Sequence, residues 1–207
     1  MEIRTSQSLV EYPVAVSVME ERVAAIKQGE KDDLLWLLEH PPLYTAGTSA
    51  KAEDLLDARF PVYETGRGGE HTYHGPGQRV GYVMVDLKKR QQSPDIKKYV
   101  HDLEEAVIRS LAHFGVNGSR RAGRVGIWVE HDNTESKIAA IGVRIRHWVT
   151  FHGVSVNLNP DLSHFGGIVP CGISNFGVTS LHELGKKITM EELDRAMVTE
   201  FKAVFAS

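Results

Sequence analysis

Hydrophobic residues recur with helical spacing in three stretches of the chain, residues 13–28, 94–114 and 189–204. The first stretch ends at Gly29, a typical helix stop, and the second opens at Ser93-Pro94 with proline in the first helical position. The third begins at Thr189 and has Glu192 three residues later, which is the pattern of a capping box. We therefore expect three amphipathic helices.

Short apolar runs, bounded by glycine, proline and polar residues, predict strands between these helices. The runs cover residues 33–39, 61–64, 81–87, 126–130, 138–146 and 148–157. Residues 132–136 are polar and form a turn, so we expect the last three strands to form an antiparallel meander. Residues 44–58 are mixed in character and predict irregular chain with one helical turn at 52–56.

The order of these elements predicts an α/β (α+β) fold with a mixed, mostly antiparallel sheet and helices packed on it. The chain shows no internal repeat, low-complexity tract or linker, so we expect a single domain over residues 1–207. A chain of 23.0 kDa is large enough to bury about 70% of its unfolded surface.

Composition narrows the classes of function. The net charge of −3 and the pI of 6.4 argue against a nucleic acid partner. The single cysteine excludes an internal disulfide and suits a reducing compartment. The first six residues lack the pattern of a signal peptide, and no apolar run approaches the ~18 residues of a membrane span. We expect a cytoplasmic protein without membrane contact.

Cys171, the single cysteine, lies in a constrained setting between Pro170 and Gly172. Proline fixes the approach of the chain, and glycine lets another group come close to the sulfur and to nearby N–H donors. This setting favours a nucleophile that attacks a carbonyl. A buried structural cysteine is the alternative, because unpaired cysteines are often buried.

A glycine-rich segment over residues 66–78 is the second candidate for chemistry, with five glycines in thirteen residues. Such a density predicts close approach of a ligand to the main chain. A phosphate-binding loop is disfavoured because the segment leads into a strand and lacks a following Gly-Lys-Ser/Thr. A flexible surface loop is the remaining alternative.

The sequence of residues 67–78, Arg-Gly-Gly-Glu-His-Thr-Tyr-His-Gly-Pro-Gly-Gln, resembles the signature of the lipoyl(octanoyl) transferases. Later blocks at residues 136–146, 151–153, Asn157 and 170–172 match that family in the same order, within a region from about Leu34 to Ile173. The resemblance implies the fold of the catalytic domain that biotin and lipoate protein ligases share.

The resemblance also implies roles for individual residues. Cys171 is expected to be the acyl-thioester nucleophile, and Lys137 the residue whose ammonium favours its thiolate. His74 is a further candidate for moving protons. The resemblance implies that Tyr73 and Ile141 supply apolar wall to the acyl-substrate site. The residues implied to line this site are Arg67, Gly68, Gly69, Glu70, His71, Thr72, Tyr73, His74, Ala140, Ile141, Gly142, Gly153, Val154 and Ser155.

By the same resemblance, the octanoyl donor is octanoyl-acyl carrier protein. The acceptors are lipoyl domains of 2-oxoacid dehydrogenase complexes and the glycine cleavage H protein, in the first step of endogenous lipoate biosynthesis. The reaction needs no cofactor and no ATP. A basic group, which could dock such acidic carriers, consists of Arg120, Arg121, Arg124, Arg144 and Arg146.

Three other interpretations stay open. An ATP-dependent lipoate or biotin ligase would use the same scaffold without a cysteine, and a carrier-binding protein would use it without chemistry. A zinc site is the third, with His71, His74, His152 and Cys171 as ligands. The absence of paired cysteine spacing weighs against zinc.

Overall fold

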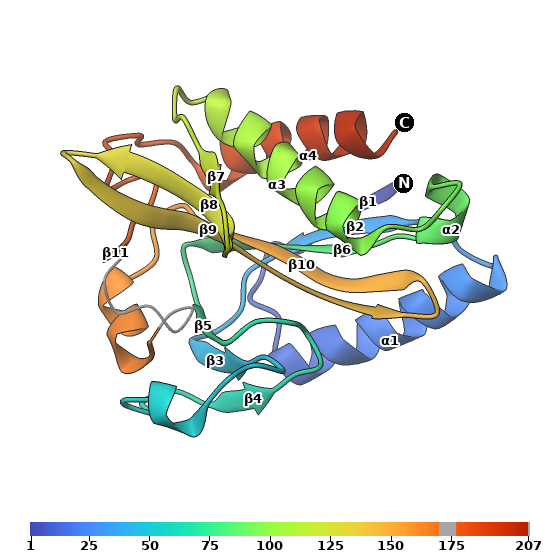
Figure 1. Cartoon of the computed structure of the whole chain (residues 1–207), viewed down its shortest axis with the longest axis horizontal. Helices are drawn as coiled ribbons and strands as arrows, with labels where there is room; N and C mark the ends of the chain where they lie inside the picture. The colour runs from blue at the N-terminus through green and yellow to red at the C-terminus, as the bar shows by residue number, and fades with distance from the viewer. Residues whose placement is uncertain (170–176, 207) are drawn as a thin grey trace.

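The computed structural model describes residues 1–169 and 177–206. A large twisted sheet runs through the middle of the molecule (Figure 1), in the order β1-β2-β6-β10-β9-β8-β7. In that order its strands are Glu2–Thr5, Leu34–Leu38, Gln78–Met84, Val149–Asn157, Thr134–Arg146, Arg124–His131 and Ser119–Arg121. The short strand β11, Gly177–Val178, pairs with β9.

Neighbouring strands of the large sheet are antiparallel except at the β1–β2 and β9–β11 pairs. The predicted fold class, a mixed and mostly antiparallel sheet with packed helices, is therefore confirmed. A small sheet, in the order β4-β3-β5, contains the strands Val62–Glu64, Leu43–Ala46 and His71–His74.

Helices cover both faces of the large sheet (Figure 1). α3 (Ile96–Ala112) and α4 (Met190–Phe205) pack on one face, in a core with β6, β8, β9 and β10. α1 (Tyr12–Gln28) packs on the opposite face, where the small sheet also lies. The remaining helical elements are α2 (Leu87–Arg90) and the 3₁₀ turns η1 (Ala52–Asp54) and η2 (Leu162–Gly167).

The helix predictions are confirmed, with one correction at a helix start. Gly29 ends α1 in the left-handed conformation, at φ 77°, and Thr189 caps α4 in a capping box with Glu192. α3, however, begins at Ile96, because the side chain of Asp95 caps the free backbone N–H groups of Lys97 and Lys98. Pro94 precedes this cap instead of occupying the first helical position.

The strand predictions were incomplete. β3 lies in the stretch expected to be irregular, and β5 lies inside the glycine-rich segment. The strand expected over residues 81–87 begins earlier, at Gln78, and ends at Met84. The meander is confirmed, but its first turn consists of Asp132 and Asn133, both with positive φ, and its second of His147 and Trp148. Such left-handed pairs fit the twist of a two-residue hairpin.

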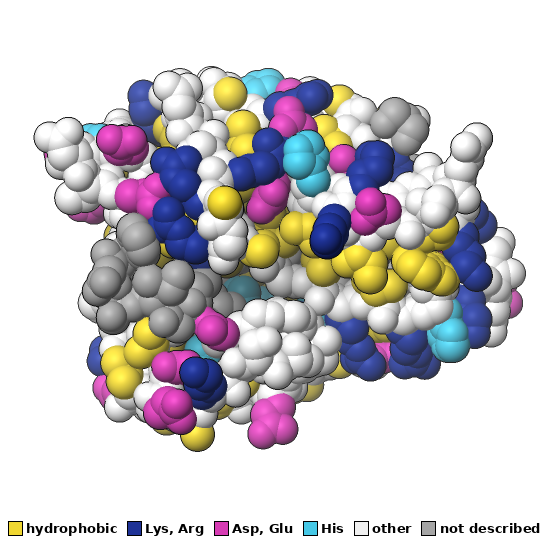
Figure 2. All heavy atoms as spheres, viewed as in Figure 1, with side chains coloured by type: hydrophobic (Ala, Val, Ile, Leu, Met, Phe, Trp, Pro, Cys, Tyr) yellow, Lys and Arg dark blue, Asp and Glu magenta, His cyan; other side chains and the backbone are white. Residues whose placement is uncertain are grey.

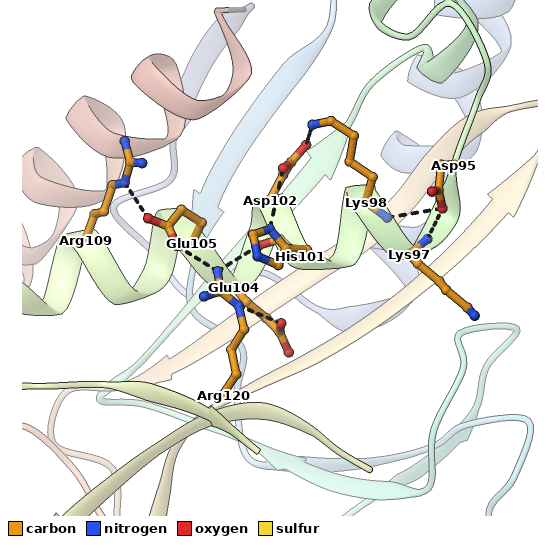
Figure 3. Close-up of polar contacts among 9 residues, drawn as sticks. All are labelled: Asp95, Lys97, Lys98, His101, Asp102, Glu104, Glu105, Arg109 and Arg120. Carbon is orange, nitrogen blue, oxygen red and sulfur yellow. Dashed lines mark hydrogen bonds and ion pairs between the residues drawn. The ribbon is translucent and has the colours of Figure 1, made fainter. Parts of the chain in front are cut away.

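The predicted basic group is paired with acidic side chains. Arg120 binds Glu104 at 3.1 Å and Glu105 at 2.7 Å, so it ties β7 to α3 (Figure 3). Arg121 and Arg124 bind Glu135, and Arg144 and Arg146 bind Glu20 of α1. These ion pairs reduce the positive field that the arginines present to a partner.

None of the helices in residues 1–169 and 177–206 has the length and apolar character that a membrane span requires.

Candidate active site

A cavity of about 270 Å³ lies between the large sheet and the glycine-rich segment. β9 and β10 form one wall, and residues 67–74 with Thr45 form the other. Figure 2 shows the molecule hollowed between these two layers, with histidine side chains at the bottom of the hollow. Its size is close to the lower end of the range for small-molecule sites, ~300–1,000 Å³.

A β-bulge in β9 turns Lys137 into this cavity. Ile127 of β8 pairs with Ala139, but the next residue, Trp128, pairs with Lys137, so Ile138 is an extra residue in β9. Ile138 and Ala139 both enter the core beneath α3 and α4. The alternation of faces therefore changes at Ile138, and Lys137 lines the cavity together with Ala140 and Gly142.

Small residues keep the sheet wall of the cavity thin. A Cβ atom on Gly142 would lie 2.9 Å from Cδ of Arg67, and one on Gly153 would lie 2.3 Å from the carbonyl oxygen of Gly81. Gly142 and Gly153 are direct cross-strand partners. Lys137 and Gly142 are separated by five steps along β9, so at ~3.3 Å per residue this wall spans at most ~17 Å, which suits a long and narrow ligand.

The side chain of Arg67 holds the glycine-rich segment in place by hydrogen bonds to backbone carbonyl groups. Its guanidinium donates to the carbonyl oxygens of Thr45 at 2.8 Å, Gly68 at 3.0 Å and Glu70 at 2.8 Å. The side chain is 8% exposed. A Cβ on Gly47 would lie 2.1 Å from the carbonyl oxygen of Gly69, so the two chains pass in direct contact.

Two buried histidines at the cavity, His74 and His152, are uncharged near neutral pH. Burial, together with neighbouring His40, lowers the pKa of His74 to about 3, although its Nδ1 bonds Oε1 of Gln78 at 2.7 Å. Burial, with Arg67 nearby, also lowers the pKa of His152 to about 3. His152 has a φ of 61°, unusual for a residue with a side chain, and its Nε2 lies 3.3 Å from the hydroxyl of Tyr12.

The structure brings most of the predicted site residues to the cavity. Those that line it are Arg67, Gly69, Glu70, His71, Thr72, His74, Lys137, Ala140, Ile141, Gly142, Gly153, Val154 and Ser155. Gly68 is not among them, and its N–H instead donates to the carbonyl oxygen of Val143 at 2.9 Å.

Tyr73 also points away from the cavity. It packs against Tyr44 and Phe165 in a separate core cluster, and its hydroxyl bonds Nδ1 of His164 at 2.8 Å. Because side chains alternate along a strand, Tyr73 of β5 faces the side opposite Thr72 and His74. The predicted role of Tyr73 as apolar cavity wall is therefore wrong.

Sequence reasoning missed lining residues that come from distant elements. Tyr12 belongs to α1, Tyr82 and Val80 to β6, and Val125 to the start of β8. An isolated apolar or aromatic residue in a strand or helix carries no sequence signal that it lines a cavity. The positive φ of His152 also has no signal in the sequence.

Cys171 lies outside the described residues, so its predicted pairing with Lys137 stays a prediction. The chain that follows is described from Gly177, six residues later, where β11 pairs with β9. Its register places Gly177 beside Ser136 and Val178 beside Lys137.

Of the four predicted zinc ligands, Cys171 lies outside the described residues, so the structure tests only the three histidines. Among residues 1–169 and 177–206, no group of three or more histidine, cysteine, aspartate or glutamate side chains is arranged to hold a metal ion. Nδ1 of His74 is occupied by Gln78.

Comparison with known families identifies the family of the chain. Residues 11–202 match the family described as the lipoyl protein ligase A/B catalytic domain. A curated octanoyltransferase from Paramagnetospirillum magneticum is 61% identical over 209 residues, with 100% of this chain and 98% of that protein covered. An octanoyltransferase from Rhodospirillum rubrum is 58% identical, with 99% and 95% covered.

Solved structures share the fold at low sequence identity. A lipoate-protein ligase A bound with ATP gives a TM-score of 0.76 at 17% identity, with 100% of this chain and 86% of that chain covered. A bi-partite lipoate protein ligase from Thermoplasma acidophilum gives a TM-score of 0.73 at 18% identity, with 100% and 84% covered. This chain therefore shares its fold with the lipoate protein ligases, as the sequence resemblance implies.

Proposed function

Because this chain belongs to the family of lipoyl protein ligase A/B catalytic domains, we propose that it is an acyltransferase that moves octanoyl groups between carrier proteins. The donor is octanoyl-acyl carrier protein, and the acceptor is the lysine of a lipoyl domain in a 2-oxoacid dehydrogenase complex or in the glycine cleavage H protein. Curated octanoyltransferases at 61% and 58% identity over nearly the whole chain support this activity.

The reaction runs through two acyl transfers on Cys171. The thiolate attacks the carbonyl carbon of the donor thioester, a new C–S bond forms, the donor's C–S bond breaks, and the carrier's thiol leaves with a proton from the Lys137 ammonium. The acceptor amine then attacks the enzyme-bound thioester and an amide bond forms. The enzyme's C–S bond breaks, Cys171 leaves as a thiolate, and neutral Lys137 takes the proton of the amine. The donor is already activated as a thioester, so no ATP is consumed.

Lys137 is the proposed partner of the thiol. A free thiol titrates near ~8.5, and an adjacent ammonium favours the thiolate. The observation that carries this role is the position of Lys137, which the β9 bulge turns into the cavity next to β11. Val178, seven residues after Cys171, pairs with Lys137, so the chain limits their separation to at most ~25 Å and permits the contact that this role requires.

Proton transfer is better assigned to Lys137 than to His74. With its pKa lowered to about 3 by burial, His74 is a weak base at neutral pH. Its bond to Gln78 instead holds the ring in the wall of the cavity.

The test is to mix the protein with octanoyl-acyl carrier protein in the absence of ATP and acceptor. We expect a mass increase of one octanoyl group on Cys171 and its transfer to a lipoyl-domain lysine when that domain is added. Cys171→Ser should abolish both steps, and Lys137→Met should lower kcat by ~10²-fold or more. Lys89→Met, at an exposed lysine of α2, is the matched control.

Labelling that requires ATP and free octanoate would instead identify a ligase, the activity named for the fold's solved neighbours. Carrier binding without any transfer would identify a non-catalytic relative. Full turnover by Cys171→Ser would contradict the covalent route.

A further inference from the structure

Trp128 lies directly across the strand pair from Lys137. The two residues are cross-strand partners in β8 and β9, and both are buried, with 2% and 6% of their surfaces exposed. Nζ of Lys137 lies 4.8 Å from the centre of the indole ring. Ile127 and Val129, on either side of Trp128, point into the opposite core. Trp128 and Lys137 therefore share the cavity face of the sheet.

An indole face attracts an ammonium group through the quadrupole of its π system when the cation lies within ~6 Å of the ring centre, and tryptophan is the strongest such side chain. The attraction is stronger where water is excluded. The buried contact between Trp128 and Lys137 meets both conditions.

The indole ring is itself held on β8. Its Nε1 donates to the carbonyl oxygen of Arg124 at 3.1 Å, and the guanidinium of Arg124 lies 4.5 Å from the ring centre. Arg124 in turn forms an ion pair with Glu135 of β9. The ring is thereby fixed to the hairpin at two points, so its face offers a defined position to the lysine.

Gly126 leaves room for the stem of the same lysine. A Cβ at this position would lie 3.3 Å from Cε of Lys137 and 2.7 Å from the carbonyl oxygen of Ala139. Its φ of 119° is also one that residues with side chains rarely adopt. Gly126 and Trp128, two positions apart on β8, together define the path of the Lys137 side chain.

We propose that Trp128 is a positioning residue for Lys137, holding its ammonium on the cavity face of β9 in the place from which it favours the thiolate. This inference deepens the proposed acyl transfer and rests on it. Trp128 does not touch the acyl group in this role and acts through the lysine.

The first test compares Trp128→Phe, which keeps a weaker aromatic face, with Trp128→Leu, which removes it. For octanoyl transfer we expect kcat to fall about 3-fold in the first and at least 10-fold in the second, with KM for the carrier nearly unchanged. The alkaline rise of the rate should move to higher pH in Trp128→Leu, because a displaced ammonium favours the thiolate less. Equal, unshifted pH profiles in all three proteins would overturn the proposal.

The second test does not need octanoyl transfer. Cys171 is the single cysteine, so the rate of its alkylation by iodoacetamide reports the thiolate fraction directly. The midpoint of that rate against pH should be higher in Trp128→Leu, intermediate in Trp128→Phe, and no higher in Trp128→Leu/Lys137→Met than in Lys137→Met. An unchanged midpoint in Trp128→Leu refutes the positioning role, whereas a wild type that alkylates as expected but transfers no octanoyl refutes the proposed function alone.

Trp36→Leu controls for the loss of a buried indole. Trp36 is 1% exposed in β2, and the guanidinium of Arg4 lies 4.3 Å from its ring centre, in the core beneath α1. This variant should be less stable in urea, with the alkylation midpoint of the wild type. A midpoint that shifts as far in Trp36→Leu as in Trp128→Leu would show a general effect of destabilisation and overturn the proposal.

Discussion

Ala140 presents a single methyl group to the cavity, one strand away from Ser155, its cross-strand partner. On either side of this position the wall is lined by Lys137 and by Gly142. A larger side chain at residue 140 would occupy the space that a long acyl chain needs, while leaving the lysine untouched.

We therefore expect Ala140→Leu to lower kcat/KM for an octanoyl donor at least tenfold, because a few lost apolar contacts change binding by ~1–3 kcal/mol. A butanoyl donor should lose less, since it needs less of the cavity. Initial rates with both donors check this. Ala24→Leu, the same change on the exposed side of α1, should affect neither.

The sequence predicts the position of some site residues but not of others. The motif of residues 67–78 led to most of one cavity wall, but alternation along β5 turned Tyr73 away from it. The direction of Lys137 depends on one extra residue in β9, and no pattern of polarity marks that bulge. In the sequence, Trp128 is an ordinary strand residue, and only the pairing of β8 with β9 brings it opposite Lys137.

At the scale of elements, helix ends are governed by local hydrogen bonds. The carboxylate of Asp95 accepts the N–H groups of Lys97 at 2.7 Å and Lys98 at 3.2 Å, as Figure 3 shows. Thr189 and Glu192 exchange side-chain and backbone bonds at the start of α4. Capping boxes are visible in sequence because both partners lie within four residues. The start of α3 was misplaced because proline and aspartate are adjacent there, and both are common near helix starts.

Asp95→Ala and Thr189→Ala should each lower the free energy of unfolding by about 1 kcal/mol, through loss of one N-cap. Urea unfolding followed by far-ultraviolet circular dichroism measures the change. Ser93→Ala tests the corrected helix boundary, and a change within ~0.5 kcal/mol is expected there. If Ser93→Ala and Asp95→Ala lower the free energy of unfolding equally, the assignment of Asp95 as the N-cap is contradicted.

Across the whole molecule, three buried histidines link stability to pH. Burial lowers the pKa of His40 to about 4, and burial with neighbouring groups lowers those of His74 and His152 to about 3. In the unfolded chain a histidine titrates near ~6.5. Below that value the unfolded chain binds protons that the folded chain does not, so stability falls as the pH drops from about 6.5 towards 4.

Each of these histidines can contribute up to ~1.4 kcal/mol of lost stability per pH unit in that window. Urea midpoints at pH 7, 6 and 5 should decrease steadily, and His40→Asn should show a shallower decrease than the wild type. His40 bonds the hydroxyl of Tyr82 and the carbonyl oxygen of Val10, so this variant is also less stable at pH 7. The slope, and not the starting value, is the measured quantity, and parallel slopes would contradict the assignment.

The order of strands in the large sheet is the feature that the sequence pattern predicts least. The meander β8-β9-β10 was predictable because its turns are short and its partners are close in sequence. The insertion of β6 between β2 and β10 joins segments that are far apart along the chain, and apolar runs do not record which run they pair with. The family resemblance provided the fold that periodicity could not.

The extra residue in β9 makes the site vulnerable in an unusual way. Inserting one residue between Lys137 and Ile138 would move Lys137 back by one position in the strand, and a shift of one position takes a side chain to the other face of a sheet. The amine of Lys137 would then turn towards the helices, although every reactive group remained in the sequence. A homologue that gained one codon here could keep all its signature residues and still be inert, so its gene should be judged by strand length as well as by motif.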